Sequence, residues 1–208
     1  AHNDGLVIAP LGIVLFIIAK EYKTKTSALN TWKTGLMIGL MTLVKLIPIV
    51  LLIPLFQSQK NTYKKLILLS STILTIIILS LLFFYDSRAV SNFIGILKFY
   101  NQTQFNSPLL HLIRVVLEGL HISQWWLVSP NILSYIRLGS IVAIGWFYRP
   151  FGFSGVITRL LAVYSVATLI SPKVHTWYLV PLIFLNCFVG WKWLSLGATL
   201  MMFTYSMY

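Results

Sequence analysis

The chain has 208 residues, of which 58% are hydrophobic and only 10% are charged, and its mean hydropathy is +0.84. An ordinary soluble domain is about 45–50% apolar and about 25% charged, so a soluble enzyme, a disordered tail and a secreted disulfide scaffold are excluded. Lys and Arg number 16 against 4 Asp and Glu, a net charge of +12. In a membrane protein this excess indicates basic cytoplasmic loops rather than nucleic-acid binding. The composition therefore predicts an all-α, polytopic membrane protein.

The sequence begins with a polar group, His2-Asn3-Asp4, and no basic region or cleavage site precedes the first apolar run. We therefore expect no signal peptide. We interpret residues 1–208 as a single transmembrane domain that is the C-terminal part of a longer chain. Two interpretations of the polar group are open. Asn3 or Asp4 caps a helix that begins near Leu6, or the three side chains orient a sugar hydroxyl or a phosphate-bound cation.

The apolar runs predict about seven helices. A perpendicular span needs roughly 20 residues, so two of the runs qualify alone and the others need flanking residues or cross only part of the bilayer. The runs are Leu6–Ala19, Gly35–Phe56, Leu66–Tyr85, Ile132–Tyr148, Val156–Ile170, Trp177–Gly190 and Leu194–Met207.

The second run, Gly35–Phe56, is interrupted by Lys45, Pro48 and Pro54. A lysine inside such a run costs about 2.5–3.5 kcal/mol on the insertion scale, and a proline removes a backbone donor and bends a helix. The run is either one kinked span or a re-entrant pair of half-helices with Lys45-Leu46-Ile47-Pro48 at the turn. Lys45 either binds an anion there or extends its ammonium group to the interface.

The charge distribution favours the re-entrant interpretation. A simple span would place the two lysine-rich loops on opposite faces, whereas a reversal at Lys45 collects the basic loops on one side. That side then carries Lys20, Lys23, Lys25, Lys33, Lys60, Lys64, Lys65, Arg149 and Lys192. The other side carries His2-Asn3-Asp4, Lys45, Asp86–Asn131 and Ser171–Trp177.

The long connection Asp86–Asn131 contains a predicted amphipathic helix, Pro108–His121. Asn-Ser-Pro is a typical helix start, with a capping serine and a proline at the first helical position. Arg114 and Glu118 can form an ion pair at a spacing of four, and a pair of tryptophans follows, as at the headgroup level. The helix is expected to lie in the membrane interface; a solvated surface helix is the alternative. Its polar stripe, turned toward water or substrate, consists of His111, Arg114, Glu118 and His121.

The segment Ser171–Tyr178 joins two apolar runs and reads Ser-Pro-Lys-Val-His-Thr-Trp-Tyr. His175 can exchange a proton near neutral pH, and Lys173 can contact a phosphate as a point charge. Trp177 and Tyr178 either stack on a sugar or polyprenyl chain or only anchor the next helix at the interface. The sequence has no P-loop, no dinucleotide fingerprint, no Gly-x-Ser-x-Gly elbow and no metal-ligand spacing, so no cofactor or metal is expected.

In this order, the motifs resemble the later half of GT-C fold glycosyltransferases, especially the polyprenol-phosphate-mannose-dependent mannosyltransferases of bacteria and archaea. The motifs are the His-Asn-Asp-Gly start of a span, the Lys-Leu-Ile-Pro break followed by Pro54 and a basic loop, the Asn-Ser-Pro helix, and the Ser-Pro-x-x-His-x-Trp-Tyr turn. The resemblance covers about Ala1–Pro181.

The resemblance implies inverting transfer of a hexose, mannose, from a polyprenyl-phosphate sugar to a lipid or glycan acceptor. It places the site on the non-cytoplasmic face of a prokaryotic plasma membrane. The general base is expected to be an acidic residue upstream of this sequence, so the chain alone should be inactive. The resemblance implies that His175 lies near the donor phosphate or the reacting hydroxyl, that Lys45 and Lys173 contact the phosphate, and that Asp4 and His2 line the acceptor pocket.

The alternative function is a transporter or flippase domain, because broken helices with buried charges also mark transport sites. Against it, the sequence has no pair of broken segments related as inverted repeats. A purely structural subunit would leave Lys45 and Asp4 without a role. We predict that His2, Lys45 and His175 approach one another on one side of the membrane. The predicted catalytic residue is His175, and the predicted substrate-binding residues are His2, Asn3, Asp4, Lys45, Lys173, Trp177, Tyr178, His111 and Arg114.

Overall fold

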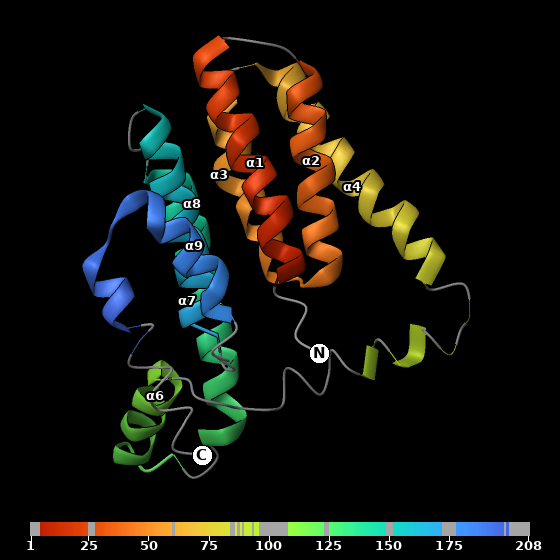
Figure 1. Cartoon of the computed structure of the whole chain (residues 1–208). Coiled ribbons are helices and arrows are strands. Elements are labelled where there is room, and N and C mark those ends of the chain that lie inside the picture. Colours follow the sequence, from red (N-terminus) through yellow and green to blue (C-terminus); the bar gives the residue numbers. More distant parts are fainter. Residues whose placement is uncertain are drawn as a thin grey trace.

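The computed structural model describes residues 5–24, 28–59, 61–83, 86, 88, 90–92, 94–95, 108–122, 125–148, 152–171, 178–197 and 199. In this part of the chain all regular secondary structure is helical, which confirms the all-α class. The elements are α1 (Gly5–Thr24), α2 (Ala28–Val44), the 3₁₀ helix η1 (Ile47–Leu51), α3 (Leu52–Ser58), α4 (Thr62–Phe83), α6 (Pro108–Gly119), α7 (Trp125–Phe147), α8 (Gly152–Leu169) and α9 (Leu179–Val189) (Figure 1).

Helices α2 and α4 run in the same direction. Gly35 of α2 lies against Ser71 of α4, and Gly39, one turn later, lies against Thr75. Since the residue numbers rise together on both helices, the chain between them must return to its starting side. The return limb is η1 with α3, and the reversal occurs at the two residues between α2 and η1, Lys45 and Leu46 (Figure 1). The predicted reversal of the run Gly35–Phe56 is therefore present.

The two limbs of the reversal differ in length, and the expectation of two half-helices is wrong for the first. Helix α2 begins at Ala28, well before the apolar run, and has 17 residues. At 1.5 Å per residue it is about 26 Å long, close to the roughly 30 Å hydrocarbon core of a bilayer. Residues 28–34 contain neither Gly nor Pro, so the helix continues through polar residues toward the basic loop.

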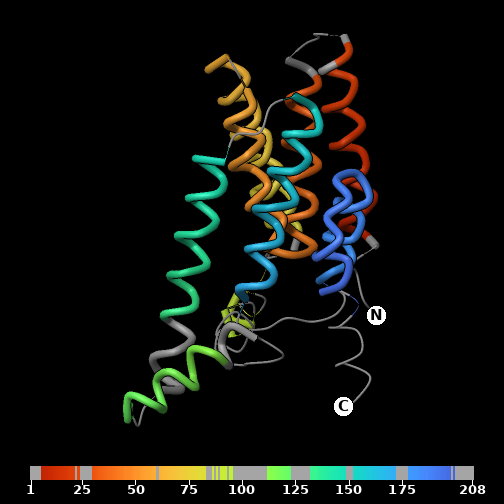
Figure 2. Tube along the Cα trace, turned by 90° about the vertical axis from the view of Figure 1, so that its left-hand side faces the viewer, coloured from red at the N-terminus to blue at the C-terminus, as the bar shows by residue number. Residues whose placement is uncertain are grey.

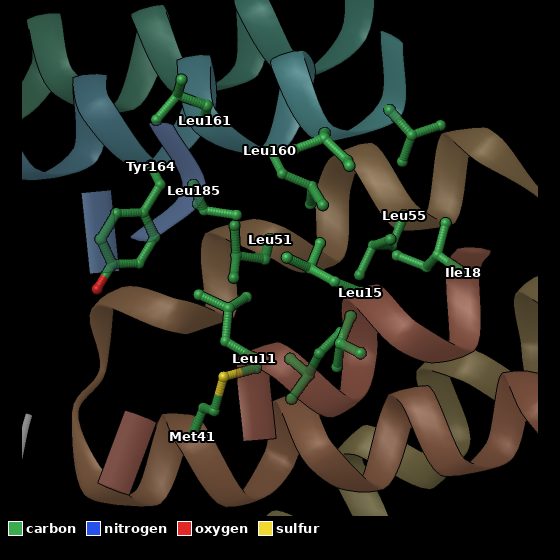
Figure 3. Packing of buried hydrophobic residues seen from close by; sticks show 14 of the residues in the cluster. Leu11, Leu15, Ile18, Met41, Leu51, Leu55, Leu160, Leu161, Tyr164 and Leu185 are labelled. Atoms are coloured by element: carbon green, nitrogen blue, oxygen red, sulfur yellow. The ribbon is translucent and has the colours of Figure 1, made fainter. Parts of the chain in front are cut away.

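The return limb lies inside the bundle. Leu51 and Leu55 are each only 1% exposed, and they pack between Leu11 and Leu15 of α1 and Leu160 of α8 (Figure 3). Non-helical backbone at membrane depth is tolerated where protein surrounds it. The apolar residues after the reversal therefore form the protein core.

Helices α7 and α8 are antiparallel. Gly145 near the end of α7 lies close to Val163 of α8, and Arg137, earlier on α7, contacts Ser171 just after α8. Arg159 of α8 also donates a hydrogen bond to the carbonyl oxygen of Gly145. The start of α7 and the end of α8 therefore lie at the same end of the molecule (Figures 1 and 2).

Two predicted boundaries in the long connection are corrected. Helix α7 begins at Trp125 and has 23 residues, so its first turns lie in the segment that was expected to precede the apolar run. Helix α6 ends at Gly119, so the predicted helix Pro108–His121 is too long. His121 has φ 57°, and the N–H of Ile122 donates to the carbonyl of Leu117 at 3.0 Å. This left-handed cap stops the helix, and His121 lies beyond its end.

The close contact of α2 with α4 gives a stability prediction. A Cβ atom on Gly35 would lie 2.7 Å from the carbonyl oxygen of Leu68, whereas one on Gly139 of α7 would meet nothing within 4 Å. We expect Gly35→Ala to lower the melting temperature in detergent, because separating the helices costs about 1–3 kcal/mol. Gly139→Ala is the matched control and should maintain or raise it, since alanine favours a helix by about 1 kcal/mol. Equal melting temperatures for the two variants would contradict this packing.

Candidate functional site

The side chain of Lys45 lies over the ring of Tyr178. The distance from Nζ to the ring centroid is 4.5 Å, which is a cation–π contact. Lys45 follows the last residue of α2, and Tyr178 precedes the first residue of α9. The structure thus brings together the helix break and the end of the Ser-Pro segment, two separate clusters in the sequence.

Local backbone geometry explains the position of Lys45. Its N–H donates to the carbonyl of Met41 at 2.9 Å, and the N–H of Ile49 donates to the carbonyl of Leu46 at 3.2 Å. Pro48 occupies the first turn of η1, where its fixed φ favours a helix start and its missing N–H costs nothing. The chain therefore reverses immediately after Lys45, which leaves this lysine at the end of the bundle, outside its leucine core.

A second cation lies at the other end of the Ser-Pro segment. Nη1 of Arg137 on α7 donates to Oγ of Ser171 at 3.3 Å, and Ser171 is buried. Arg137 is not among the predicted site residues, because hydropathy alone predicts a simple apolar helix over Ile132–Tyr148. Arg137 is the only charged residue in that run. This signal could have identified it, since ionisable residues at membrane depth are functional candidates by default.

The two cations contact opposite ends of the Ser-Pro segment. Arg137 meets the segment Ser171–Tyr178 at its first residue and Lys45 meets it at its last. The sequences of α2, η1, α3, α7, α8 and α9 contain no Asp or Glu. A fixed cation stabilises a bound anion, so either cation suits a phosphate group. Among the residues that the structure describes, no cluster of His, Cys, Asp or Glu could hold a metal ion.

Several predicted site residues lie outside the described part of the chain. They are His2, Asn3, Asp4, Lys173, His175 and Trp177. Their roles, and the predicted approach of His2 and His175 to Lys45, remain predictions. The described residues that adjoin them in the chain are Gly5 at the start of α1, Ser171 after α8 and Tyr178 before α9.

Helix α6 forms a separate polar surface. Nε of Arg114 lies 3.2 Å from Oε1 of Glu118, and both side chains are about half exposed, which confirms the predicted ion pair. His111 lies on the same helix. In both views α6 is set apart from the lower ends of α1 and α2 (Figures 1 and 2). Helix α6 therefore lies apart from the helix break that follows α2 (Figures 1 and 2).

Helix α4 has an apolar outer surface. Among the residues that the structure describes, two helical stretches, Thr62–Leu82 and Gly152–Leu169, are long and apolar enough to cross a membrane. On α4, Leu74, Ile77 and Leu81 are each at least half exposed. A water-exposed stripe of this kind would be costly, whereas lipid acyl chains solvate it.

Glycosyltransferase family 87 matches residues 2–172 of the chain. The chain belongs to this family. The family places it among the membrane-bound glycosyltransferases, enzymes that transfer a sugar from a donor to an acceptor. The match covers the helix break, Arg137 and Ser171, and it ends within the Ser-Pro segment, before Tyr178. No curated protein and no solved structure was found to match the chain.

Proposed function

We propose that this family 87 chain belongs to an enzyme that transfers a hexose, mannose, from a polyprenyl-phosphate sugar to a lipid or glycan acceptor. The observation that carries this proposal is the position of the Lys45 ammonium group over the ring of Tyr178, 4.5 Å from its centroid. An ammonium group at the end of the bundle can meet a lipid-linked phosphate while the lipid tail stays in the membrane. The neighbouring ring offers an apolar surface to the sugar or to the first isoprene unit.

The chemistry is an inverting substitution at the anomeric carbon. The bond between C1 and the phosphate oxygen breaks, and the acceptor hydroxyl oxygen forms a bond to C1 from the opposite face. The hydroxyl proton passes to a carboxylate base, and polyprenyl phosphate leaves with its oxygen. Negative charge grows on that phosphate, so cations fixed beside it lower the barrier. Lys45 and Lys173 have this role in the proposal.

His175 is the proposed catalytic residue of the segment. It precedes Tyr178 by three residues, so chain geometry keeps the two Cα atoms within about 11 Å. Its imidazole can donate a hydrogen bond to the phosphate or transfer a proton at the reacting hydroxyl. Trp177 borders the donor in this arrangement. His2, Asn3 and Asp4 form one wall of the acceptor pocket, next to the start of α1. In this proposal an acidic side chain is the general base that accepts the hydroxyl proton.

The proposed site faces the non-cytoplasmic side of a prokaryotic plasma membrane. Lys20 and Lys23 lie in the last turns of α1, and Lys64 and Lys65 lie in the first turn of α4. These basic ends are opposite the end that carries Lys45 (Figure 1). Basic residues are retained on the cytoplasmic side of membrane proteins, which directs Lys45 outward.

The test is a donor comparison with the full-length protein, purified in detergent. It would be supplied with a polyprenyl-phosphate mannose and, in a parallel reaction, with a nucleotide-linked mannose. We expect transfer from the lipid donor only, with inversion at the anomeric carbon as followed by NMR. Transfer from the nucleotide sugar alone would reject the proposal. Movement of a lipid across vesicle membranes without sugar transfer would favour the flippase alternative.

Helix α6 gives a prediction about membrane contact. Leu112 and Val116 are 58% and 53% exposed on the side away from the ion pair of Arg114 and Glu118. We propose that this apolar side enters the interface while the ion pair faces water. In liposomes, spin labels at Leu112 and Val116 should be accessible to oxygen, and labels at the charged pair to a water-soluble nickel reagent. A label at Leu117, which is buried, is the control for low accessibility to both. A depth profile that crosses the whole bilayer would contradict the interfacial position.

A further inference from the structure

Arg137 is a charged residue in an otherwise apolar part of α7. It is only partly exposed, and no other Lys, Arg, Asp or Glu occurs between Ile132 and Phe147. An ionisable residue inside an apolar helix is a functional candidate by default. The other residues between Ile132 and Phe147 are apolar, aromatic or small, so the helix itself needs no arginine.

The contact of Arg137 with Ser171 does not balance its charge. A serine hydroxyl is neutral, the distance is 3.3 Å, and a guanidinium has five N–H donors. Neither α7 nor its neighbour α8 contains an acidic residue. An anionic ligand would compensate the charge and use the fixed fork of donors, which fits two oxygens of one phosphate.

Joining α7 to α8 is a role that another residue already fills. Arg159 of α8 donates to the carbonyl oxygen of Gly145 on α7, and the two helices pack closely there. Arg137 instead lies at the level of Ser171, where the Ser-Pro segment begins. Lys45 meets that segment at its last residue, Tyr178. The two cations thus flank the segment that carries Lys173 and His175.

We propose that Arg137 is a second cation of the donor site and, together with Lys45, binds the phosphate of the polyprenyl-phosphate sugar. This inference rests on the proposed function. The donor phosphodiester carries one negative charge, and the leaving polyprenyl phosphate acquires a second when the bond to C1 breaks. Two cations match that product better than one. The contact of Arg137 with Ser171 then fixes the guanidinium at the start of the segment.

The experiment measures phosphate recognition separately from sugar transfer. The full-length protein in detergent is titrated with farnesyl phosphate and, as the neutral comparison, with farnesol, and donor KM and kcat are measured in parallel. The variants are Arg137→Gln and Arg137→Lys. Leu138→Ala, a change at a 61% exposed neighbour on the same helix, is the matched control.

We expect Arg137→Gln to weaken farnesyl phosphate binding about 10–100-fold, since a hydrogen-bonded charge contact is lost. Arg137→Lys keeps the charge but lacks the forked guanidinium group. Its affinity for farnesyl phosphate should therefore lie between those of the wild type and Arg137→Gln. Farnesol binding should be the same in all proteins, and Leu138→Ala should match the wild type. Unchanged farnesyl phosphate binding in Arg137→Gln, or an equal loss of farnesol binding, overturns the inference.

If Arg137→Gln does not accumulate, Arg137→Lys decides. If this variant has the wild-type melting temperature and a raised donor KM, the result supports phosphate binding by Arg137. An unchanged donor KM overturns the inference.

The proposed function and the proposed role of Arg137 can fail separately. Farnesyl phosphate binding that depends on Arg137, without any mannosyl transfer by the wild type, rejects the transferase assignment alone. Normal transfer and normal phosphate binding by Arg137→Gln rejects the role of Arg137 alone.

Discussion

Replacing His175 with alanine is expected to reduce mannosyl transfer about 10²–10⁴-fold, the usual effect of losing a positioned proton-transfer group. The reduction should be in kcat, with little change in expression or melting temperature. A residue that only packs at the interface would instead lower yield and thermal stability when truncated. The measurement is a donor titration with polyprenyl-phosphate mannose on detergent-purified full-length protein, together with a thermal melt of each variant.

Two companion variants make the result interpretable. His121→Asn removes another histidine, an exposed one beyond α6 whose left-handed backbone suits asparagine, and it should leave kcat unchanged. Lys173→Ala should mainly raise the donor KM, because a solvated charge contributes little to stability. Wild-type turnover by His175→Ala at wild-type expression would falsify the catalytic role. The segment would then be a structural turn, and the site would have to be sought around Asp4 and Lys45.

The reversal at Lys45 could be predicted from the sequence because its causes are local. A lysine followed by Pro48 disfavours a continuous span, and the positions of the flanking lysines favour a return to the same side. The length of α2 could not be obtained in the same way. Hydropathy locates the apolar run, but the helix continues to Ala28 through polar residues that hydropathy does not distinguish from a loop.

The contacts of the candidate site depend on tertiary packing. The sequence predicts that Lys45 and the segment Ser171–Trp177 lie on one side of the membrane. The contact of Lys45 with Tyr178, however, requires the start of α9 to pack beside the helix break. The contact of Arg137 with Ser171 requires the antiparallel pairing of α7 with α8. The residue pattern within one helix does not specify the position along that helix at which a neighbouring helix contacts it. Composition did mark Arg137 as an isolated charge, so the residue could be found from the sequence although its partner could not.

Replacing Lys45 with methionine is expected to lower kcat/KM for the lipid-linked donor about 10²–10³-fold, the effect of removing one preorganised group that stabilises developing negative charge. Methionine keeps an unbranched apolar side chain, so packing against Tyr178 should persist while the charge is lost. Lys45→Arg should retain most activity. Lys192→Ala removes an exposed lysine beyond the other end of α9 and is the control for a change in net charge.

The aromatic partner separates phosphate binding from simple anchoring at the interface. Tyr178→Phe keeps the ring face and should maintain the donor KM, whereas Tyr178→Leu removes the ring beneath the ammonium group and should raise it. If Lys45 only extends to the headgroups, Lys45→Met would lower the melting temperature without changing the donor KM, and Tyr178→Leu would leave KM unchanged as well. The decisive result is a rise in donor KM for both Lys45→Met and Tyr178→Leu that does not occur in Lys45→Arg or Tyr178→Phe. This result requires a cationic group, ammonium or guanidinium, that packs on the ring and contacts the donor.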